Sequence, residues 1–149
     1  EIVQGDWSSD VCSSDLELAD LELAYAPPFG SAKDAVNMLG YVAENIINSL
    51  TETAQWHEID KYRNEGFSFV DVRSSGEFAN GTIPGSINIP VDEMRERHTE
   101  IANMKVIVNC QVGQRGHVAT MLLRSLGYDA KNLDGGYLTW INSPAASQN

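Results

Sequence analysis

The sequence contains few of the residues on which several common classes of protein depend. Its 149 residues include two cysteines, Cys12 and Cys110, which are too few for a disulfide framework and fit a reducing compartment. The three histidines, His57, His98 and His117, lack the spacing of metal ligands, so we assign no metal. No apolar run approaches the roughly 18–20 residues that cross a bilayer, and the first residues lack the pattern of a secretory signal. We therefore expect a cytoplasmic protein without a membrane span.

Basic residues are scarce, above all in the first third of the chain. Residues 1–52 carry ten acidic residues against one basic residue, Lys33, and residues 53–149 carry eleven acidic residues against nine basic ones. The corresponding net charges are −9 and −2, within a total of −11. Such a chain repels a polyanion and offers it no basic stripe. We therefore predict that the protein binds no nucleic acid.

The sequence pattern divides the chain into four segments. Residues 6–16 are polar and without helical or strand period, and one back-translation of them matches a common sequencing-library adaptor. We interpret residues 1–16 as a foreign or disordered leader and exclude them from the prediction of the fold. Residues 17–52 contain a short apolar stretch, a proline-containing loop and a helix, and residues 53–143 alternate strand and helix. Residues 144–149 are predicted to be a flexible tail.

One amphipathic helix is expected between residues 34 and 50. Ser31 is the expected cap, with Asp34 three residues further on. An apolar stripe at helical spacing follows, which predicts a face packed against something apolar, either the next segment or a partner that the chain has lost. The stripe comprises Val36, Leu39, Val42, Ala43, Ile46 and Leu50.

The same region resembles the end of the dimerisation domain of flavin-dependent disulfide reductases of the coenzyme A disulfide reductase type. The residues that carry the resemblance are 23–29 (Leu-Ala-Tyr-Ala-Pro-Pro-Phe), 32–34 and 37–43. It implies that Tyr25 lies near a disulfide substrate at a dimer interface, and that residues 17–52 contact missing reductase domains or form a homodimer. No G-x-G-x-x-G follows an expected strand, so the sequence lacks the glycine-rich loop that binds the phosphates of a dinucleotide. FAD, NAD(P)H and CoA would belong to the missing part, and we expect no cofactor in this chain.

The pattern from residue 53 onward predicts an α/β domain: an open, mostly parallel sheet flanked by helices, with the preceding helix as an N-terminal appendage. The segment most typical of a central strand is 105–109 (Lys-Val-Ile-Val-Asn), because its three middle residues are apolar and β-branched. Further strands are expected at 67–72, 87–89 and 129–133, and helices at 75–80, 91–99 and 116–125.

The strongest candidate for chemistry is Cys110, directly after the expected central strand. Ligands of open α/β sheets bind at the carboxyl ends of the strands. A loop that curls around the cysteine would aim backbone N–H groups at the sulfur, and the following helix start would add partial positive charge, so that both stabilise a thiolate. The alternative is a buried, inert cysteine. The loop comprises Gln111, Val112, Gly113, Gln114, Arg115 and Gly116, of which Gly113 permits a positive φ and Arg115 can clamp an anion.

The length of this loop bears on the substrate. Four residues separate Cys110 from Arg115, one fewer than in cysteine-dependent phosphatases. A tighter loop suits a single sulfur carried on the cysteine as a persulfide. A phosphatase would also need a general acid, and Asp71 and Asp92 remain open as candidates for that role.

The cysteine loop and its framing motifs resemble the rhodanese (sulfurtransferase) family. The first framing motif comprises 71–73 (Asp-Val-Arg), 77–78 (Glu-Phe) and 81–90, with Thr82 where the family usually has histidine. The second comprises 133–137 (Leu-Asp-Gly-Gly-Tyr) with Trp140.

This resemblance implies that a Cys110 persulfide carries sulfane sulfur from a small anionic donor such as thiosulfate, or from a persulfide or polysulfide, to a thiophilic acceptor. Asp71, Arg73 and Glu77 are expected to give structural support, as an ion-pair network that locks the end of the strand to the next helix. The alternatives are an accessory sulfur-delivery or docking module of a flavin- and NAD(P)H-dependent disulfide or polysulfide reductase, and a cysteine-dependent phosphatase.

Overall fold

The computed structural model describes residues 15–21 and 35–148 of the chain. The chain divides into two compact units, Glu1–Leu50 and Thr51–Asn149. The predicted Tyr25 site and Cys12 lie outside the described residues. No helix in the described ranges is both long and apolar enough to span a bilayer.

In the first unit, a 3-10 helix η1 (Asp15–Asp20) packs against helix α1 (Ala35–Ile47). The buried side chain of Asn37 joins them, because its Nδ2 donates hydrogen bonds to the carbonyls of Leu18, Ala19 and Leu21 at 3.2, 3.3 and 2.9 Å. The predicted apolar stripe is therefore not the face that η1 covers. Most of the stripe is exposed, at Val36, Leu39, Val42, Ile46 and Leu50.

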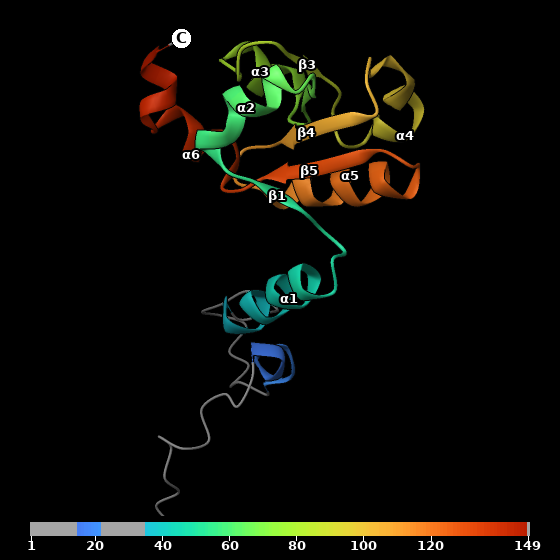
Figure 1. Cartoon of the computed structure of the whole chain (residues 1–149), viewed down its shortest axis with the longest axis vertical. Helices are drawn as coiled ribbons and strands as arrows, with labels where there is room; N and C mark the ends of the chain where they lie inside the picture. The colour runs from blue at the N-terminus through green and yellow to red at the C-terminus, as the bar shows by residue number, and fades with distance from the viewer. Residues whose placement is uncertain (1–14, 22–34, 149) are drawn as a thin grey trace, which may run out of the picture. The chain divides into compact units, whose positions relative to one another are not determined.

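The second unit contains a five-stranded parallel sheet with the strand order β1-β5-β4-β2-β3 (Figure 1). This arrangement confirms the predicted fold class. The strands are β1 (Thr53–Ala54), β2 (Ser68–Asp71), β3 (Ser86–Asn88), β4 (Lys105–Asn109) and β5 (Asp129–Leu133). The α-helices are α2 (Ile59–Asn64), α3 (Ser75–Ala79), α4 (Met94–Arg97), α5 (Gln114–Ser125) and α6 (Gly136–Ile141). Three 3-10 helices complete the unit, η2 (Trp56–Glu58), η3 (His98–Glu100) and η4 (Pro144–Gln148).

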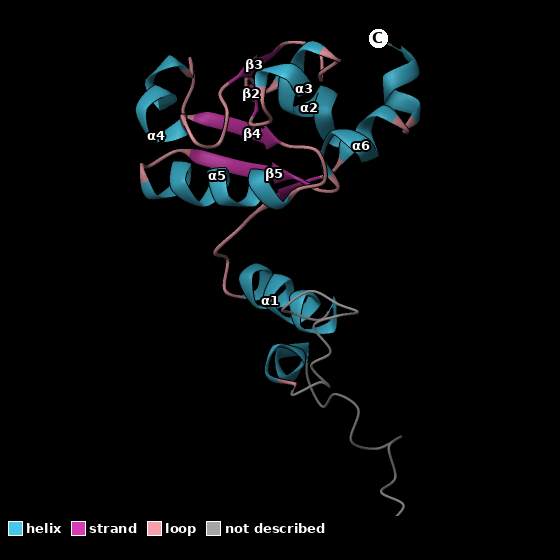
Figure 2. Cartoon of the chain, turned by 180° about the vertical axis from the view of Figure 1, so that it is seen from behind, coloured by secondary structure: helices cyan, strands magenta, loops and turns pink. Residues whose placement is uncertain are grey.

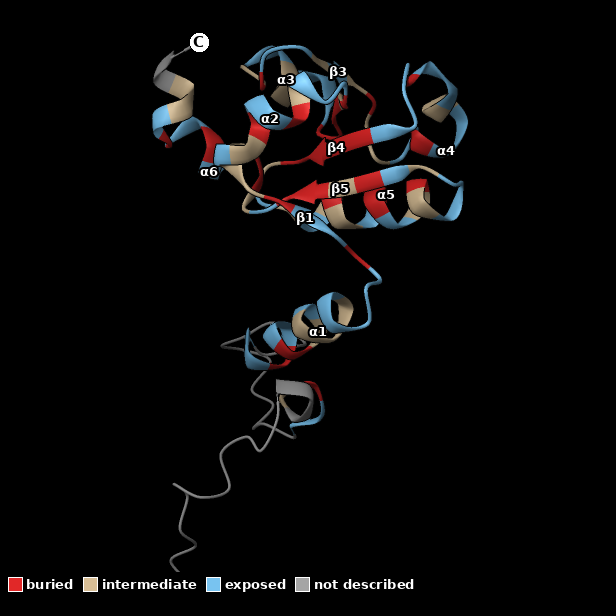
Figure 3. Cartoon of the chain, in the orientation of Figure 1, coloured by how far each residue is buried: buried red, intermediate tan, exposed pale blue. Residues whose placement is uncertain are grey.

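Each face of the sheet has its own apolar cluster, because successive side chains of a strand point to opposite faces. In β4, Val106 and Val108 join a cluster with residues of α4 and α5, whereas Ile107 joins a second cluster with residues of α2 and α6. The two layers of helices can be followed in Figure 2. Figure 3 shows that β4 and β5 are buried over most of their length. The carboxyl end of β4 is thus held rigidly between two packed layers.

Several elements differ from those predicted. Strand β1 and helices α2 and α6 were not expected. Two residues are too few to show alternation, and α6 begins within the pair Gly135–Gly136, which is typical of a turn. The predicted helix over 91–99 is shorter, with α4 followed by η3. Helix α5 begins at Gln114 rather than at 116, because Gly113 supplies the N-cap.

Candidate active site

Cys110 follows the last residue of β4, and its neighbours β2 and β5 place it in the middle of the sheet. Cys110 is buried, with 1% of its surface exposed, and it belongs to the apolar cluster that contains Val72 and Val108. The backbone N–H of Gly113 donates a hydrogen bond to Sγ at 3.1 Å. Burial alone would suit an inert cysteine, whereas the amide on Sγ is the kind of contact that the catalytic hypothesis requires.

The loop after Cys110 turns through Gly113 and leads directly into α5. Gly113 has φ +114°, a conformation that residues with a Cβ rarely adopt. Its carbonyl accepts a hydrogen bond from Nδ2 of Asn132 in β5, at 3.1 Å, which fixes the turn against the sheet. The first N–H groups of a helix have no partner within it. The amides of Gln114, Arg115 and Gly116 therefore begin the helix four to six residues after the cysteine.

The first turn of α6 holds the backbone of the cysteine. The N–H of Tyr137 donates to the carbonyl of Cys110 at 2.7 Å, and the N–H of Leu138 donates to that of Gln111 at 3.0 Å. The approach is so close that a Cβ at Gly136 would lie 2.5 Å from the Cys110 oxygen. The sequence pattern did not predict this role of α6, although the glycine pair at its start is a visible signal of close backbone contact.

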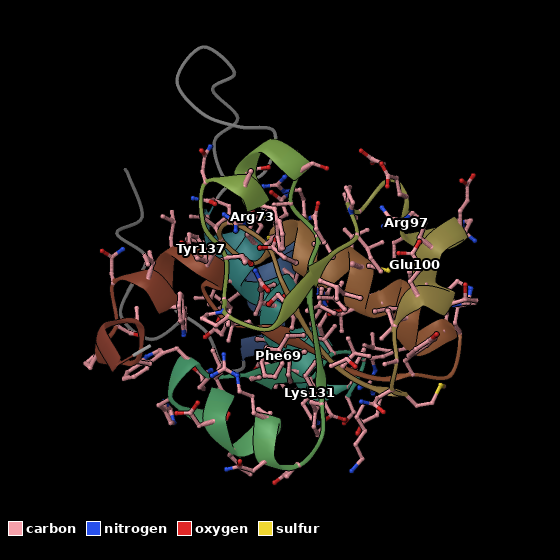
Figure 4. The ribbon with its side chains drawn as sticks, turned by 90° about the horizontal axis from the view of Figure 1, so that it is seen from above. Phe69, Arg73, Arg97, Glu100, Lys131 and Tyr137 are labelled. Atoms are coloured by element: carbon pink, nitrogen blue, oxygen red, sulfur yellow. The ribbon has the colours of Figure 1, made fainter. Side chains whose placement is uncertain are left out.

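Asp71 and Arg73 form a buried ion pair beside the loop. The two side chains are 0% and 3% exposed, and Arg73 Nη2 lies 2.7 Å from Asp71 Oδ2. The hydroxyl of Thr82 donates a hydrogen bond to the same oxygen at 2.8 Å, so Thr82 and the ion pair form one hydrogen-bond network. Arg73 Nη1 donates to Oε1 of Gln111 at 3.1 Å. The network therefore reaches the first residue of the cysteine loop, and Figure 4 shows Arg73 beside Tyr137.

Glu77 lies outside that network, which corrects the prediction of a single cluster. Its carboxylate pairs instead with Arg115, with Nη2–Oε1 and Nη1–Oε2 distances of 2.7 and 2.8 Å. The hydrogen bonds from Arg115 hold the pKa of the Glu77 carboxyl well below its usual range. The same bonds, and to a smaller extent the neighbouring Cys110, raise the pKa of Arg115. The guanidinium predicted to clamp an anion is therefore engaged by a carboxylate.

The remaining candidates are placed as follows. Asp71 is bound by Arg73 and Thr82 and is fully buried, which leaves it no free position as a general acid of a phosphatase. Asp92 is exposed, as is Val112 in the middle of the loop. The structure thus brings together Cys110, its loop, the Asp71–Arg73 pair and Glu77, and leaves Asp92 without a described link to them.

The matches to known proteins agree with this arrangement. Residues 49–143 match the rhodanese-like domain family, and the chain belongs to that family. The human thiosulfate:glutathione sulfurtransferase is 39% identical over 87 residues, which cover 48% of this chain and 76% of that protein.

Two larger solved structures match most of the chain. The crystal structure of reduced CoADR-RHD from Bacillus anthracis superposes with a TM-score of 0.81 and 49% identity over 86% of this chain. A NAD-dependent persulfide reductase from A. fulgidus superposes with a TM-score of 0.74 and 36% identity over 85% of this chain. In each case the match covers 23% of the larger protein, so the chain corresponds to less than a quarter of either.

Proposed function

We propose that this protein is a sulfurtransferase that carries sulfane sulfur on Cys110, from a thiosulfate, persulfide or polysulfide donor to a thiophilic acceptor. The observation that carries the proposal is the placement of Sγ at the end of β4, with the N–H of Gly113 at 3.1 Å and the start of α5 next along the chain. Backbone donors aimed at sulfur stabilise a thiolate and a persulfide anion over their protonated forms. Membership of the rhodanese-like family supports the same function.

The reaction consists of two displacements at sulfur. In the first, the Cys110 thiolate attacks the outer sulfur of the donor, a new S–S bond forms, and the donor's S–S bond breaks with its electron pair on the leaving group. With thiosulfate the leaving group is sulfite, and the protein keeps a Cys110–S–S⁻ persulfide. In the second, a thiophile such as cyanide attacks the outer sulfur, leaves as thiocyanate and restores the thiolate. No external oxidant or reductant is needed.

The loop supplies what each displacement requires. Negative charge stays on sulfur throughout, so the donors that matter are the fixed N–H groups of residues 111–116 rather than a proton-donating acid. The outer sulfur of a persulfide lies one bond beyond Sγ, and the free amides at the start of α5 are suited to bind it. Arg115 is the one cationic side chain in this loop, and we assign it to the anionic donor.

The test is sulfur transfer from thiosulfate to cyanide by the full chain, with thiocyanate as the readout, in the wild type and in Cys110→Ser. We expect transfer by the wild type and none above background by the variant. Mass spectrometry after incubation with donor alone should detect one added sulfur atom on the wild type only. Equal rates in the two proteins would remove Cys110 from the reaction.

We also propose that the chain is part of a fusion between a flavin- and NAD(P)H-dependent reductase and this domain. Two observations support this proposal. The matches to CoADR-RHD and to the persulfide reductase extend over both units of the chain, and α1 has exposed apolar residues, among them Leu39 and Ile46. FAD, NAD(P)H and CoA would bind the reductase part, and residues 17–52 would join it as a homodimer surface, with Tyr25 near its substrate.

Self-association tests this second proposal. Sedimentation of the full chain should give a mass that rises with concentration, and Leu39→Glu should keep it monomeric. A wild-type chain that stays monomeric at all concentrations would contradict the homodimer surface without affecting the role of Cys110.

A further inference from the structure

The ion pair between Glu77 and Arg115 links two elements that are far apart in the sequence. Glu77 lies in α3, after β2, and Arg115 lies in the first turn of α5. The pair is bidentate, with both N–O distances below 3 Å, and the two side chains are 34% and 38% exposed. The pair is neither buried in the core nor fully solvated. A dissolved anion can therefore compete with the Glu77 carboxylate for the guanidinium of Arg115.

Positive charge is in short supply around Cys110. Residues 110–116 contain one cationic side chain, that of Arg115. The next cation that contacts the loop, Arg73, is buried and paired with Asp71. Glu77 therefore opposes the one side-chain charge in this loop that could attract an anionic donor.

The carboxylate of Glu77 is held in this position by its own helix. Its Oε2 accepts hydrogen bonds from the N–H and the hydroxyl of Ser74, at 3.0 and 2.8 Å, and Ser74 Oγ accepts the N–H of Glu77 in return. This is a capping box, in which a Ser and a Glu three residues apart satisfy the first amides of a helix. Because α3 fixes the carboxylate, Arg115 meets a counter-ion that is already in place.

We propose that Glu77 is a specificity-determining residue, which disfavours doubly charged sulfur donors by occupying the guanidinium of Arg115. This role rests on the proposed sulfurtransferase function. An anion that approaches Cys110 meets a guanidinium whose charge is balanced, so a second negative charge on the donor gains little attraction. Removal of the Glu77 charge frees Arg115, and a dianion gains more from this than a monoanion does.

A pair of donors that differ mainly in charge makes the proposal testable. Thiosulfate is a dianion and methanethiosulfonate is a monoanion, and each carries its outer sulfur on a sulfonyl-type sulfur. In both cases the Cys110 thiolate forms a bond to the outer sulfur, and the S–S bond breaks with its electron pair on the leaving group. That group is sulfite in the first case and methanesulfinate in the second. The ratio of kcat/KM for the two donors, with cyanide as acceptor, therefore reports the preference for donor charge.

The variant to measure is Glu77→Gln, because glutamine also completes a capping box and so preserves α3. We expect the ratio of kcat/KM for thiosulfate over methanethiosulfonate to rise, on the order of two- to fivefold, mainly through a lower KM for thiosulfate. The rise should shrink as salt is added, because screening weakens interactions between exposed charges. A purely structural role of Glu77 would change both donors alike and without dependence on salt.

Glu100→Gln is the matched control. Glu100 also forms a bidentate pair with an arginine, Arg97, at 2.7 and 2.8 Å, and Figure 4 shows both labels apart from those of Arg73 and Tyr137. The control loses the same charge from the protein as a whole, so its donor ratio should match that of the wild type. Arg115→Gln, which removes the cation and leaves the Glu77 charge unbalanced, should shift the ratio in the opposite direction and serves if Glu77→Gln does not fold.

The outcomes separate this role from the proposed function. Absence of Cys110-dependent transfer by the wild type from either donor would overturn the function and this role with it. Transfer by the wild type with an unchanged ratio in Glu77→Gln, or an equal shift in Glu100→Gln, would overturn the role of Glu77 alone.

Discussion

The guanidinium of Arg73 lies over the ring of Tyr137, with its Cζ 4.1 Å from the ring centroid. The two residues belong to the two framing motifs on either side of the cysteine loop. The same guanidinium contacts Asp71 and Gln111, and the N–H of Tyr137 holds the carbonyl of Cys110. One buried cation therefore ties together the three segments that surround the sulfur, and this relationship underlies the first two predictions.

Replacement of Asp71 by Asn should destabilise the protein by about 3–5 kcal/mol, because it leaves Arg73 buried without its counter-charge. Urea unfolding of the full chain measures the loss. The control is Asp60→Asn, which breaks the pair with Arg63 at a site where the Asp60 side chain is 79% exposed, and should cost about 0–1 kcal/mol. Similar losses in the two variants would contradict the importance of burial at Asp71.

Thr82→Val should cost about 1–3 kcal/mol, since the substitution keeps the shape of the side chain but removes a hydrogen bond to a buried carboxylate. Because Asp71 retains Arg73, the loss should be smaller than in Asp71→Asn. Unfolding curves of both variants under identical conditions check this order. A valine variant as stable as the wild type would show that the hydroxyl contributes no net stabilisation.

Gly113→Ala should lower both stability and sulfur transfer. A φ of +114° is strained for alanine, at about 1–3 kcal/mol, and relief of the strain would move the N–H that contacts Sγ. Gly76→Ala is the control, because a Cβ there meets nothing within 4 Å and alanine favours a helix. Thiocyanate production and unfolding are both measured, and a fully active Gly113→Ala would argue against a fixed amide at this position.

The pH dependence of stability should change in Glu77→Gln. Arg115 lowers the pKa of Glu77 from its ordinary value of 4.5, so this carboxylate contributes stability that is fully present above that value. The contribution disappears as the pH falls through the lowered value of the folded protein. Between pH of about 4.5 and 2, the wild type should therefore lose stability more steeply than the variant.

Urea midpoints at a series of pH values provide the measurement for this prediction. Added salt should reduce the difference between the two slopes, because both side chains are about one third exposed. Other carboxylates with lowered pKa, such as Glu100, titrate in both proteins and cancel in the comparison. Parallel curves would mean that the ion pair contributes nothing in solution.

Local sequence was sufficient to predict the placement of the cysteine. A β-branched run that ends at Cys110, followed by a glycine and a helix, determines the position of the loop through strand alternation and helix spacing alone. Gly113 at positive φ follows from the same local geometry. These features depend on neighbours within a few residues, which is the range over which sequence patterns carry information.

Partners that are distant in the sequence were harder to predict. Glu77 and Arg115 are 38 residues apart, and nothing in either segment shows which of several charged residues will meet. The contact of Tyr137 with Cys110 depends on α6, whose start was hidden by the glycine pair. The apolar stripe of α1 indicated a packed face, but the buried polar Asn37 made the contact with η1. Packing between elements decided each of these cases.

The two-residue strand β1 has a consequence for any attempt to isolate the rhodanese-like domain. The carbonyls of Glu52 and Ala54 accept the N–H groups of Asn132 and Asp134, so this short segment closes the outer margin of β5. In a shortened protein that starts beyond residue 54, β5 would be an exposed edge strand with unpaired backbone groups. Strand pairing between molecules and precipitation would follow. A cut before Thr51 keeps the margin covered.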